Sequence, residues 1–242
     1  MPEQITLYSA KICPFAHRVE LALAEAKVGY NRYEIDLANK PEWYAPQSEP
    51  REQAYGGPQV SPDLPSPEST KIAESLILVE FVADLYPESA ILPKDPVQRA
   101  KARFFIDAVS TKFLPAYMGP VARGQPFEPF WDALEDLQRL LPEDKKYAVG
   151  DEYTAADIAI TPFLARMEVW MKNDIGAYKE GEGKKASEYF FGSGRFKRFV
   201  KYFEDIKARE SFKATTTSGE KYAARFAPLR AQAQAAAVAA AA

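Results

Sequence analysis

The period of the hydrophobic pattern changes once along the chain, and this change constrains the fold most strongly. Residues 4–8 are typical of a strand, residues 14–27 of a helix that Gly29 would close, and residues 30–36 of a second strand. Such a unit predicts two parallel strands joined by a right-handed crossover, with the helix packed on the sheet. Beyond residue 93 the period is helical throughout. The sequence therefore predicts an α/β domain followed by an all-α domain.

A region rich in proline and glycine separates the opening unit from the next helix. Residues 41–67 hold seven prolines together with Gly56 and Gly57, which indicates loops and turns with at most short strands. Residues 70–73 could form an edge strand. Glu74 and Ser75 then precede an apolar helix that runs to Leu85. We expect domains at 1–92 and 93–230.

In the second half, aromatic and aliphatic residues recur at three- and four-residue spacing, as in Trp131, Leu134, Leu137 and Leu141. Thr154 can cap a helix whose Asp157 bonds back to the amide of the cap, a structural device. The tail at 231–242 is rich in alanine and has no face to bury, so we expect a frayed helix or a disordered end.

Composition narrows the range of functions. The 242 residues are 47% hydrophobic, enough for one large or two modest cores, and they include one cysteine. With no internal disulfide, no signal-peptide pattern and no apolar run near 18 residues, the expected location is the cytoplasm. Thirty-one basic and 34 acidic residues give a net charge of -3 without long blocks of one sign, which argues against nucleic acid as the main partner. No cluster of His or Cys indicates a metal.

The single cysteine, Cys13, lies between the first strand and the first helix. At this place the unpaired amides and the dipole of the helix favour the thiolate, and Pro14 suits the first helical position. Because residue 16 is alanine, no Cys-x-x-Cys pair exists, so disulfide chemistry needs a second thiol from a small molecule. The alternative is a buried, inert cysteine.

Several motifs in order resemble the omega class of the cytosolic glutathione transferases. They are Cys13-Pro14-Phe15-Ala16, Asn39-Lys40-Pro41-Glu42-Trp43, Ile72-Ala73-Glu74-Ser75, Leu85-Tyr86-Pro87 and Leu92-Pro93. Their order is more specific than any one alone. The resemblance covers most of residues 5–225 and implies a thioredoxin-like domain that binds glutathione, a helical domain over a hydrophobic co-substrate site, and a homodimer.

The resemblance also assigns roles to residues. Cys13, beside Pro14 and Phe15, would form a mixed disulfide with glutathione. Glu74 and Ser75 would hold the γ-glutamyl end, whose ammonium and carboxylate suit an acidic side chain and a helix N-terminus, and Lys40 would face the glycyl carboxylate. Without the resemblance, Glu74-Ser75 is an ordinary helix start and Lys40 a solvated lysine.

One segment departs from the family. Its members carry a Val-Pro pair before the third strand, whose backbone pairs with the cysteinyl part of glutathione, whereas this chain has no Val-Pro between Ser48 and Ala54. Either residues 51–53, including Gln53, make this clamp, or glutathione binds weakly.

In the family the helical domain lines the hydrophobic site. The residues expected there are Tyr117, Met118, Arg123, Phe127, Phe130, Trp131, Met167 and Trp170. Aromatic and methionine side chains suit flat, varied ligands, although helical spacing alone predicts burial in a core, and Arg123 could be solvated. Ser9 is a second candidate for activating a thiol, and His17 could share the helix face of Cys13.

The leading hypothesis is a glutathione-dependent thiol transferase and deglutathionylating reductase that works through Cys13. A second hypothesis is a non-catalytic or weakly catalytic binder (ligandin) of aromatic or polyphenolic compounds. A third is an interaction domain within a larger complex.

Overall fold

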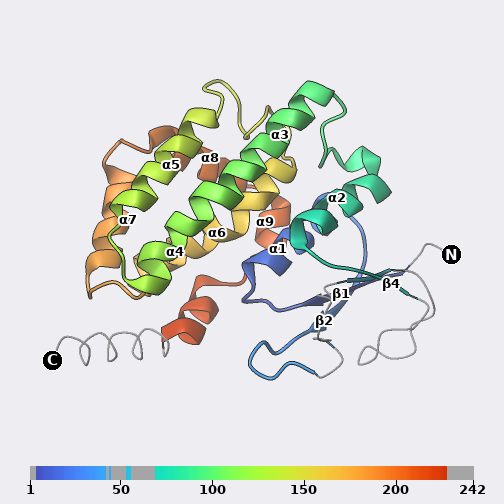
Figure 1. The fold of residues 1–242 in the computed structure, drawn as a ribbon, viewed down its shortest axis with the longest axis horizontal. Helices are drawn as coiled ribbons and strands as arrows, with labels where there is room; N and C mark the ends of the chain where they lie inside the picture. Colours follow the sequence, from blue (N-terminus) through green and yellow to red (C-terminus); the bar gives the residue numbers. More distant parts are fainter. Residues whose placement is uncertain (1–3, 42–43, 45–52, 56–68, 228–242) are drawn as a thin grey trace. The chain divides into compact units, whose positions relative to one another are not determined.

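The computed structural model describes residues 4–41, 44, 53–55 and 69–227. The chain divides into two compact units, Met1–Leu92 and Pro93–Ala242 (Figure 1). The tail at 231–242 lies outside the described residues.

The first unit contains a mixed four-stranded sheet in the order β2-β1-β3-β4. The strands are β1 (Ile5–Ser9), β2 (Asn31–Glu34), β3 (Gln53–Tyr55) and β4 (Thr70–Ile72). β1 and β2 are parallel, which confirms the predicted strand–helix–strand unit, and β3 pairs antiparallel with both β1 and β4. β4 is an edge strand, as predicted.

Two helices, α1 (Pro14–Glu25) and α2 (Ser75–Leu85), pack against each other in the first unit, and the short 3-10 helix η1 (Pro87–Ser89) follows α2 (Figure 1). Val19 and Leu23 of α1 and Leu78 and Val82 of α2 are fully buried. These apolar side chains, spaced by four residues, lie on the buried faces of the two helices and form the core of the unit.

The C-terminal end of α1 differs from the prediction. Gly29 does not close the helix; α1 ends at Glu25, and Lys27 adopts a left-handed conformation with φ of 55°. The amide of Lys27 bonds Ala24 O at 3.1 Å and the amide of Val28 bonds Leu23 O at 3.1 Å. This pair of bonds satisfies the last carbonyls, so the termination motif forms two residues before the glycine.

The second unit is helical throughout its described residues. Its helices are α3 (Pro96–Ala108), the π-helix η2 (Val109–Phe113), α4 (Leu114–Arg123), α5 (Glu128–Leu140), α6 (Ala155–Lys172), α7 (Glu182–Gly192), α8 (Lys197–Lys207) and α9 (Glu210–Thr215). Residues 219–227 are helical as well. The predicted fold class, an α/β domain followed by an all-α domain, is confirmed.

The π-helix joins α3 and α4 into one continuous rod (Figure 1). Pro115 has no amide hydrogen, and its ring clashes with a carbonyl four residues back in a regular α-helix. The amide of Leu114 reaches Val109 O instead, five residues back. This wider turn lies directly before the segment that carries Tyr117 and Met118.

The predicted capping box at the start of α6 is present. The Asp157 carboxylate accepts hydrogen bonds from the backbone amide of Thr154 and from the amide of Ala148, both at 2.8 Å, and from the Tyr202 hydroxyl at 2.8 Å. Burial raises the pKa of Asp157. The cap thus fixes α6, the preceding loop and α8 to one another.

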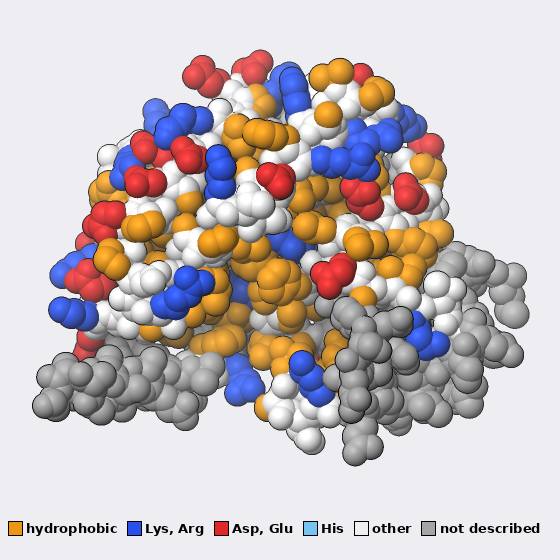
Figure 2. Space-filling model, viewed as in Figure 1, with side chains coloured by type: hydrophobic (Ala, Val, Ile, Leu, Met, Phe, Trp, Pro, Cys, Tyr) orange, Lys and Arg blue, Asp and Glu red, His pale blue; other side chains and the backbone are white. Residues whose placement is uncertain are grey.

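Charged side chains of both signs are interspersed over the face of the helical unit in Figure 2, without a large area of one sign. None of the helices in the described part of the chain is long and apolar enough to cross a bilayer.

Candidate active site

Cys13 occupies the N-cap position of α1. Its backbone is extended, with φ of -75° and ψ of 120°, and Pro14 is the first helical residue. The Cys13 amide bonds Ala10 O at 2.8 Å, and the first helical hydrogen bond runs from His17 N to Cys13 O at 3.2 Å. The thiol therefore lies at the N-terminal end of α1, where the helix dipole carries its partial positive charge. Cys13 is a free, half-buried cysteine.

A buried arginine ties the start of α1 to the start of α2. Arg18 is 2% exposed, and its Nη1 donates to Ser75 Oγ at 3.2 Å. Its guanidinium also lies 5.3 Å from the centre of the Phe15 ring, a cation–π contact. Sequence reasoning missed Arg18, because its partner lies 57 residues further along the chain.

Glu74 is the N-cap of α2 and Ser75 is its first residue, so the pair lies at a helix start, where the sequence predicts it. Glu74 is exposed and has φ of 72° and ψ of 111°, a conformation that L-residues rarely adopt. Ser75 is buried. Strain of this kind persists where the surroundings fix the backbone, and it concentrates at ligand sites.

Ser9 and His17, the two further candidates near Cys13, are both buried. The Ser9 hydroxyl donates to Glu20 Oε1 at 2.7 Å, and Arg32 Nε donates to the same oxygen at 2.8 Å. Ser9 therefore belongs to a polar network that joins β1, α1 and β2, which is a structural role.

Two further residues, Lys40 and Gln53, are predicted to contact glutathione. Lys40 is exposed and has no hydrogen-bond or ion-pair partner among the described residues. The Gln53 backbone lies in β3, in register with Leu7 of β1 and Ile72 of β4. Residues 48–52, where the Val-Pro pair is missing, lie outside the described residues.

In the helical unit, Tyr117 is the centre of an aromatic cluster. Its ring stacks on Phe113 and Trp170 at centroid distances of 5.6 and 5.8 Å, and it meets Phe130 and Phe163 edge-on at 6.0 and 5.8 Å. We call these five residues the Tyr117 cluster.

The cluster holds two buried polar atoms, the Tyr117 hydroxyl and the Trp170 indole nitrogen. Neither has a hydrogen-bond partner within the part of the chain that the structure describes. Tyr117 is 3% exposed, and burial raises the pKa of its hydroxyl. Such orphaned groups are rare in proteins, and each calls for an explanation.

A short helical segment contacts this cluster. The ring of Phe226 lies 5.9 Å from that of Trp170, and Phe226 stacks on Tyr222 at 4.6 Å. Sequence reasoning did not select these residues, because the segment at 219–227 has no long apolar repeat.

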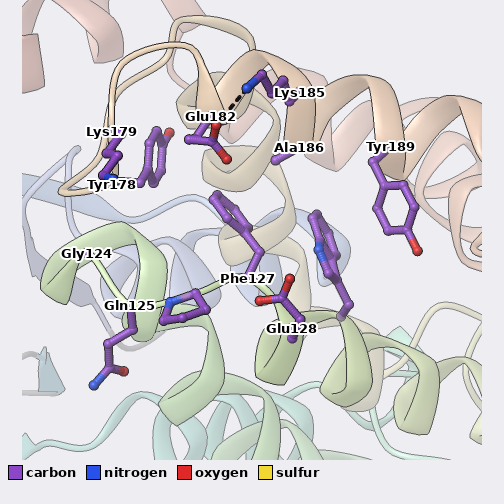
Figure 3. Close-up of a pocket in the computed structure, with 12 residues that line it drawn as sticks. Gly124, Gln125, Phe127, Glu128, Tyr178, Lys179, Glu182, Lys185, Ala186 and Tyr189 are labelled. Carbon is purple, nitrogen blue, oxygen red and sulfur yellow. Dashed lines mark hydrogen bonds and ion pairs between the residues drawn. The ribbon is translucent and has the colours of Figure 1, made fainter.

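The other predicted co-substrate residues fall into three groups. Met167 is fully buried, whereas Met118 is 37% exposed and Arg123 is exposed. Phe127 and Trp131 line a separate pocket of about 550 Å³ between the start of α5 and α7 (Figure 3). The lining of this α5–α7 pocket is residues 124–128, Trp131, Tyr178, Lys179, Glu182, Lys185, Ala186 and Tyr189.

No group of three or more His, Cys, Asp or Glu side chains suited to a metal ion occurs among the residues that the structure describes.

Comparison with known proteins defines the family. Residues 7–90 match the model of the glutathione S-transferase N-terminal domain, and residues 124–190 match that of the C-terminal domain. Glutathione transferase Omega 1C from Trametes versicolor is 54% identical; the alignment covers 95% of this chain and 99% of that chain, with a TM-score of 0.87. Omega 2C from the same fungus is 56% identical over 93% and 100% of the two chains, with a TM-score of 0.86.

A third structure, of glutathione transferase Omega 2S from Trametes versicolor in complex with 2,4-dihydroxybenzophenone, is 42% identical. It covers 91% of this chain and 96% of that chain, with a TM-score of 0.84. The chain therefore belongs to the omega class of the glutathione transferase family, which confirms the resemblance inferred from its motifs. Glutathione is its substrate, and it is an enzyme of the transferase type.

Proposed function

We propose that this glutathione transferase acts as a thiol transferase and deglutathionylating reductase through Cys13. The observation that carries the proposal is the placement of the chain's single cysteine at the N-cap of α1, with Pro14 as the first helical residue. Other transferases use a Tyr or Ser hydroxyl to activate glutathione, but Ser9 is buried and engaged with Glu20. A thiol at this position attacks sulfur directly, and it has no neighbouring cysteine to resolve the product.

The reaction proceeds in two exchanges. The Cys13 thiolate attacks the glutathione sulfur of a mixed disulfide, the substrate thiolate leaves and takes up a proton, and Cys13 is left joined to glutathione. A second glutathione thiolate then attacks the glutathione sulfur of this disulfide. Oxidised glutathione leaves, and the Cys13 thiolate is restored.

Glu74, Ser75 and Lys40 would hold the tripeptide during both exchanges. The exposed Glu74 carboxylate suits the ammonium of the γ-glutamyl group, and the N-terminus of α2 suits its carboxylate. Arg18 would orient the Ser75 hydroxyl, to which it already donates. The exposed ammonium of Lys40 would pair with the glycyl carboxylate, and Pro14, Phe15 and Gln53 would border the cysteinyl part.

A Cys13→Ser variant tests this mechanism with a glutathione mixed disulfide as substrate. A serine hydroxyl is hardly ionised near neutral pH, so we expect a loss of turnover of about a thousandfold or more. Unchanged turnover would exclude the mechanism. The matched control is Ser9→Ala, for which we expect activity close to that of the unmodified enzyme in a protein that still folds.

A second function, binding of aromatic small molecules, is favoured by the Tyr117 cluster. A ligand oxygen that accepted hydrogen bonds from the Tyr117 hydroxyl and the Trp170 indole would satisfy both orphaned groups. The relative that was crystallised with 2,4-dihydroxybenzophenone supports a phenolic ligand for this chain as well. Phe130 and Met167 would form the apolar backing, and Met118 and Arg123 the solvent-exposed side.

Replacing Tyr117 by Phe separates ligand recognition from core packing. Loss of one hydrogen bond should weaken binding of 2,4-dihydroxybenzophenone about tenfold, while the melting temperature without ligand stays equal or rises because a buried unsatisfied hydroxyl is gone. Calorimetric titration and thermal unfolding measure the two effects. Unchanged affinity would remove Tyr117 from the site, and a large drop in stability would make its hydroxyl structural.

We further propose a homodimer. Val97 and Phe104, seven residues apart on one face of α3, are 60% and 62% exposed. Large apolar side chains at this exposure are typical of a surface that a second copy of the chain covers.

A further inference from the structure

The α5–α7 pocket lies entirely within the helical unit. Its volume of about 550 Å³ falls in the range of small-molecule sites, roughly 300–1,000 Å³. Its lining includes neither Cys13 nor Tyr117 nor Trp170. The pocket is thus distinct from both sites described above.

Aromatic side chains form the walls of this pocket. Phe127 stacks on Trp131 at 5.4 Å with an interplanar angle of 18°, and it meets Tyr178 at 5.3 Å. Tyr189 lies 5.3 Å from Trp131 on the other side. Figure 3 shows Phe127 pointing toward α7, between Tyr178 at one end of the pocket and Tyr189 at the other. Ala186 of α7, a small side chain, leaves the space between them open.

The walls are held in place from behind. The buried Asp174 carboxylate accepts from the amides of Gly181 and Gly183, both at 2.8 Å, and so fixes the turn that leads into α7. The Tyr178 hydroxyl donates to Trp170 O at 2.9 Å. Arg195 donates to the Tyr189 hydroxyl at 3.3 Å. A wall fixed in this way loses little freedom when a ligand enters, which favours binding.

Glycine is required where the pocket turns. Gly124 has φ of 62°, and a Cβ at this position would lie 2.8 Å from Ala177 O. The chain therefore brings the α4–α5 turn, which lines the pocket at Gly124, into direct contact with the segment before α7.

The charges at the open side of the pocket balance. Lys185 pairs with Glu182 at 2.8 Å, while the side chains of Lys179 and Glu128 have no hydrogen-bond or ion-pair partner among the described residues. An anionic ligand would meet two carboxylates and a cationic ligand two ammonium groups. A neutral phenol is favoured, because its hydroxyl groups can donate to Glu128 and accept from Lys179 while its rings lie along the aromatic walls.

We propose that the α5–α7 pocket is a second ligand site, independent of Cys13, that takes neutral phenolic aromatic molecules. Such a site would let the enzyme bind phenols without reacting with them. Three features indicate this class of ligand: the aromatic side chains that form the walls, the hydrogen bonds that hold those walls in place, and the equal number of positive and negative charges at the opening.

Calorimetric titration of the full chain with 2,4-dihydroxybenzophenone tests this proposal. Ala186→Leu fills the pocket with a larger side chain, and Tyr189→Ala removes one of its aromatic walls. Because the Tyr189 side chain is 39% exposed, Tyr189→Ala should fold even if Ala186→Leu does not. In each variant we expect the Kd for 2,4-dihydroxybenzophenone at this pocket to rise tenfold or more. The rate of thiol transfer through Cys13 should stay within about twofold of that of the unmodified enzyme. Ala214→Leu, at an exposed position on α9, is the matched control.

Binding that is unchanged in both variants would overturn the proposal. Tyr117→Phe identifies any binding that belongs to the Tyr117 cluster, and Cys13→Ser should leave the pocket's affinity unaltered. A second probe, 2,4-dihydroxybenzoate, tests the charge argument: it should bind at least tenfold more weakly than the neutral ketone. Tighter binding of the carboxylate that Ala186→Leu abolishes would contradict the neutral ligand class.

Discussion

Glu74 combines a strained backbone with an exposed carboxylate, and the two can be tested separately. Its φ of 72° costs an L-residue about 1–3 kcal/mol, which glycine would not pay. Both Glu74→Gly and Glu74→Ala remove the carboxylate, so each should weaken glutathione binding tenfold or more. The free energy of unfolding of Glu74→Gly should nevertheless be about 1 kcal/mol higher than that of Glu74→Ala, so the glycine variant is the more stable one.

Urea unfolding and calorimetric titration with glutathione measure these effects, with Asp84→Ala, an exposed acid on the same helix, as control. Equal stability of the two Glu74 variants would mean that the backbone is unstrained. Unaltered affinity would remove Glu74 from the glutathione site.

At the residue scale, the sequence predicts what is local. Cys13, Pro14 and the turn around them are determined by neighbours in sequence, and so is the cap of Thr154 and Asp157. The pairing of Arg18 with Ser75 depends on how two distant segments meet, and nothing in the local pattern indicates it. Likewise, helical spacing predicts burial of Phe127 and Trp131 but not that they face an open pocket.

At the scale of elements, one carboxylate joins two helices of the second unit. Glu168 of α6 accepts from Lys172 Nζ at 2.7 Å and from Lys207 Nζ of α8 at 3.2 Å. Burial raises the pKa of Glu168, but the two lysines outweigh burial and lower it overall. A carboxyl group whose pKa is lower in the folded protein stabilises it above the pKa of the unfolded chain, and this contribution is lost as pH falls through the folded pKa.

Glu168→Gln should therefore destabilise the protein by about 1 kcal/mol at neutral pH, and the difference should disappear in acid. Urea unfolding at a series of pH values measures it, with the exposed Glu188→Gln as control. A difference that stayed constant with pH would show that packing, not ionisation, is responsible.

For two elements, the local sequence does not determine where they end or how they pair. The helix at 14–27 is predicted, but its end is not, because Lys27 adopts a left-handed conformation that is rare outside glycine and asparagine. The three-residue strand β3 carries too few residues for a pattern, so the order of the sheet could not be derived.

At the scale of the molecule, the change of hydrophobic period predicts an α/β unit followed by helices, and the fold has this form. What the pattern lacks is information on assembly, since an exposed apolar residue in a helix has the same spacing as a buried one. Phe104 illustrates this: it belongs to the helical repeat of α3 yet is 62% exposed.

Phe104→Glu should convert the proposed dimer into a monomer, because a charge on the contact face must be desolvated. Analytical ultracentrifugation measures the mass, and Ala214→Glu on α9 is the control. The folded monomer should keep its helical content, since the side chain is exposed in the single chain. A dimer that persists in Phe104→Glu would place the interface elsewhere, and an unmodified chain that sediments as a monomer would exclude the dimer.

In the proposed reaction, Cys13 at the N-cap of α1 exchanges disulfides with glutathione. Mass spectrometry of the intact protein after brief exposure to oxidised glutathione tests this directly, because the chain has a single cysteine. We expect one glutathione per folded chain, formed at least tenfold faster than in the urea-unfolded chain, absent in Cys13→Ser and removed by reduced glutathione. If the folded chain acquires glutathione no faster than the unfolded chain, or keeps it in the presence of reduced glutathione, Cys13 is not the reactive thiol of the proposed reaction.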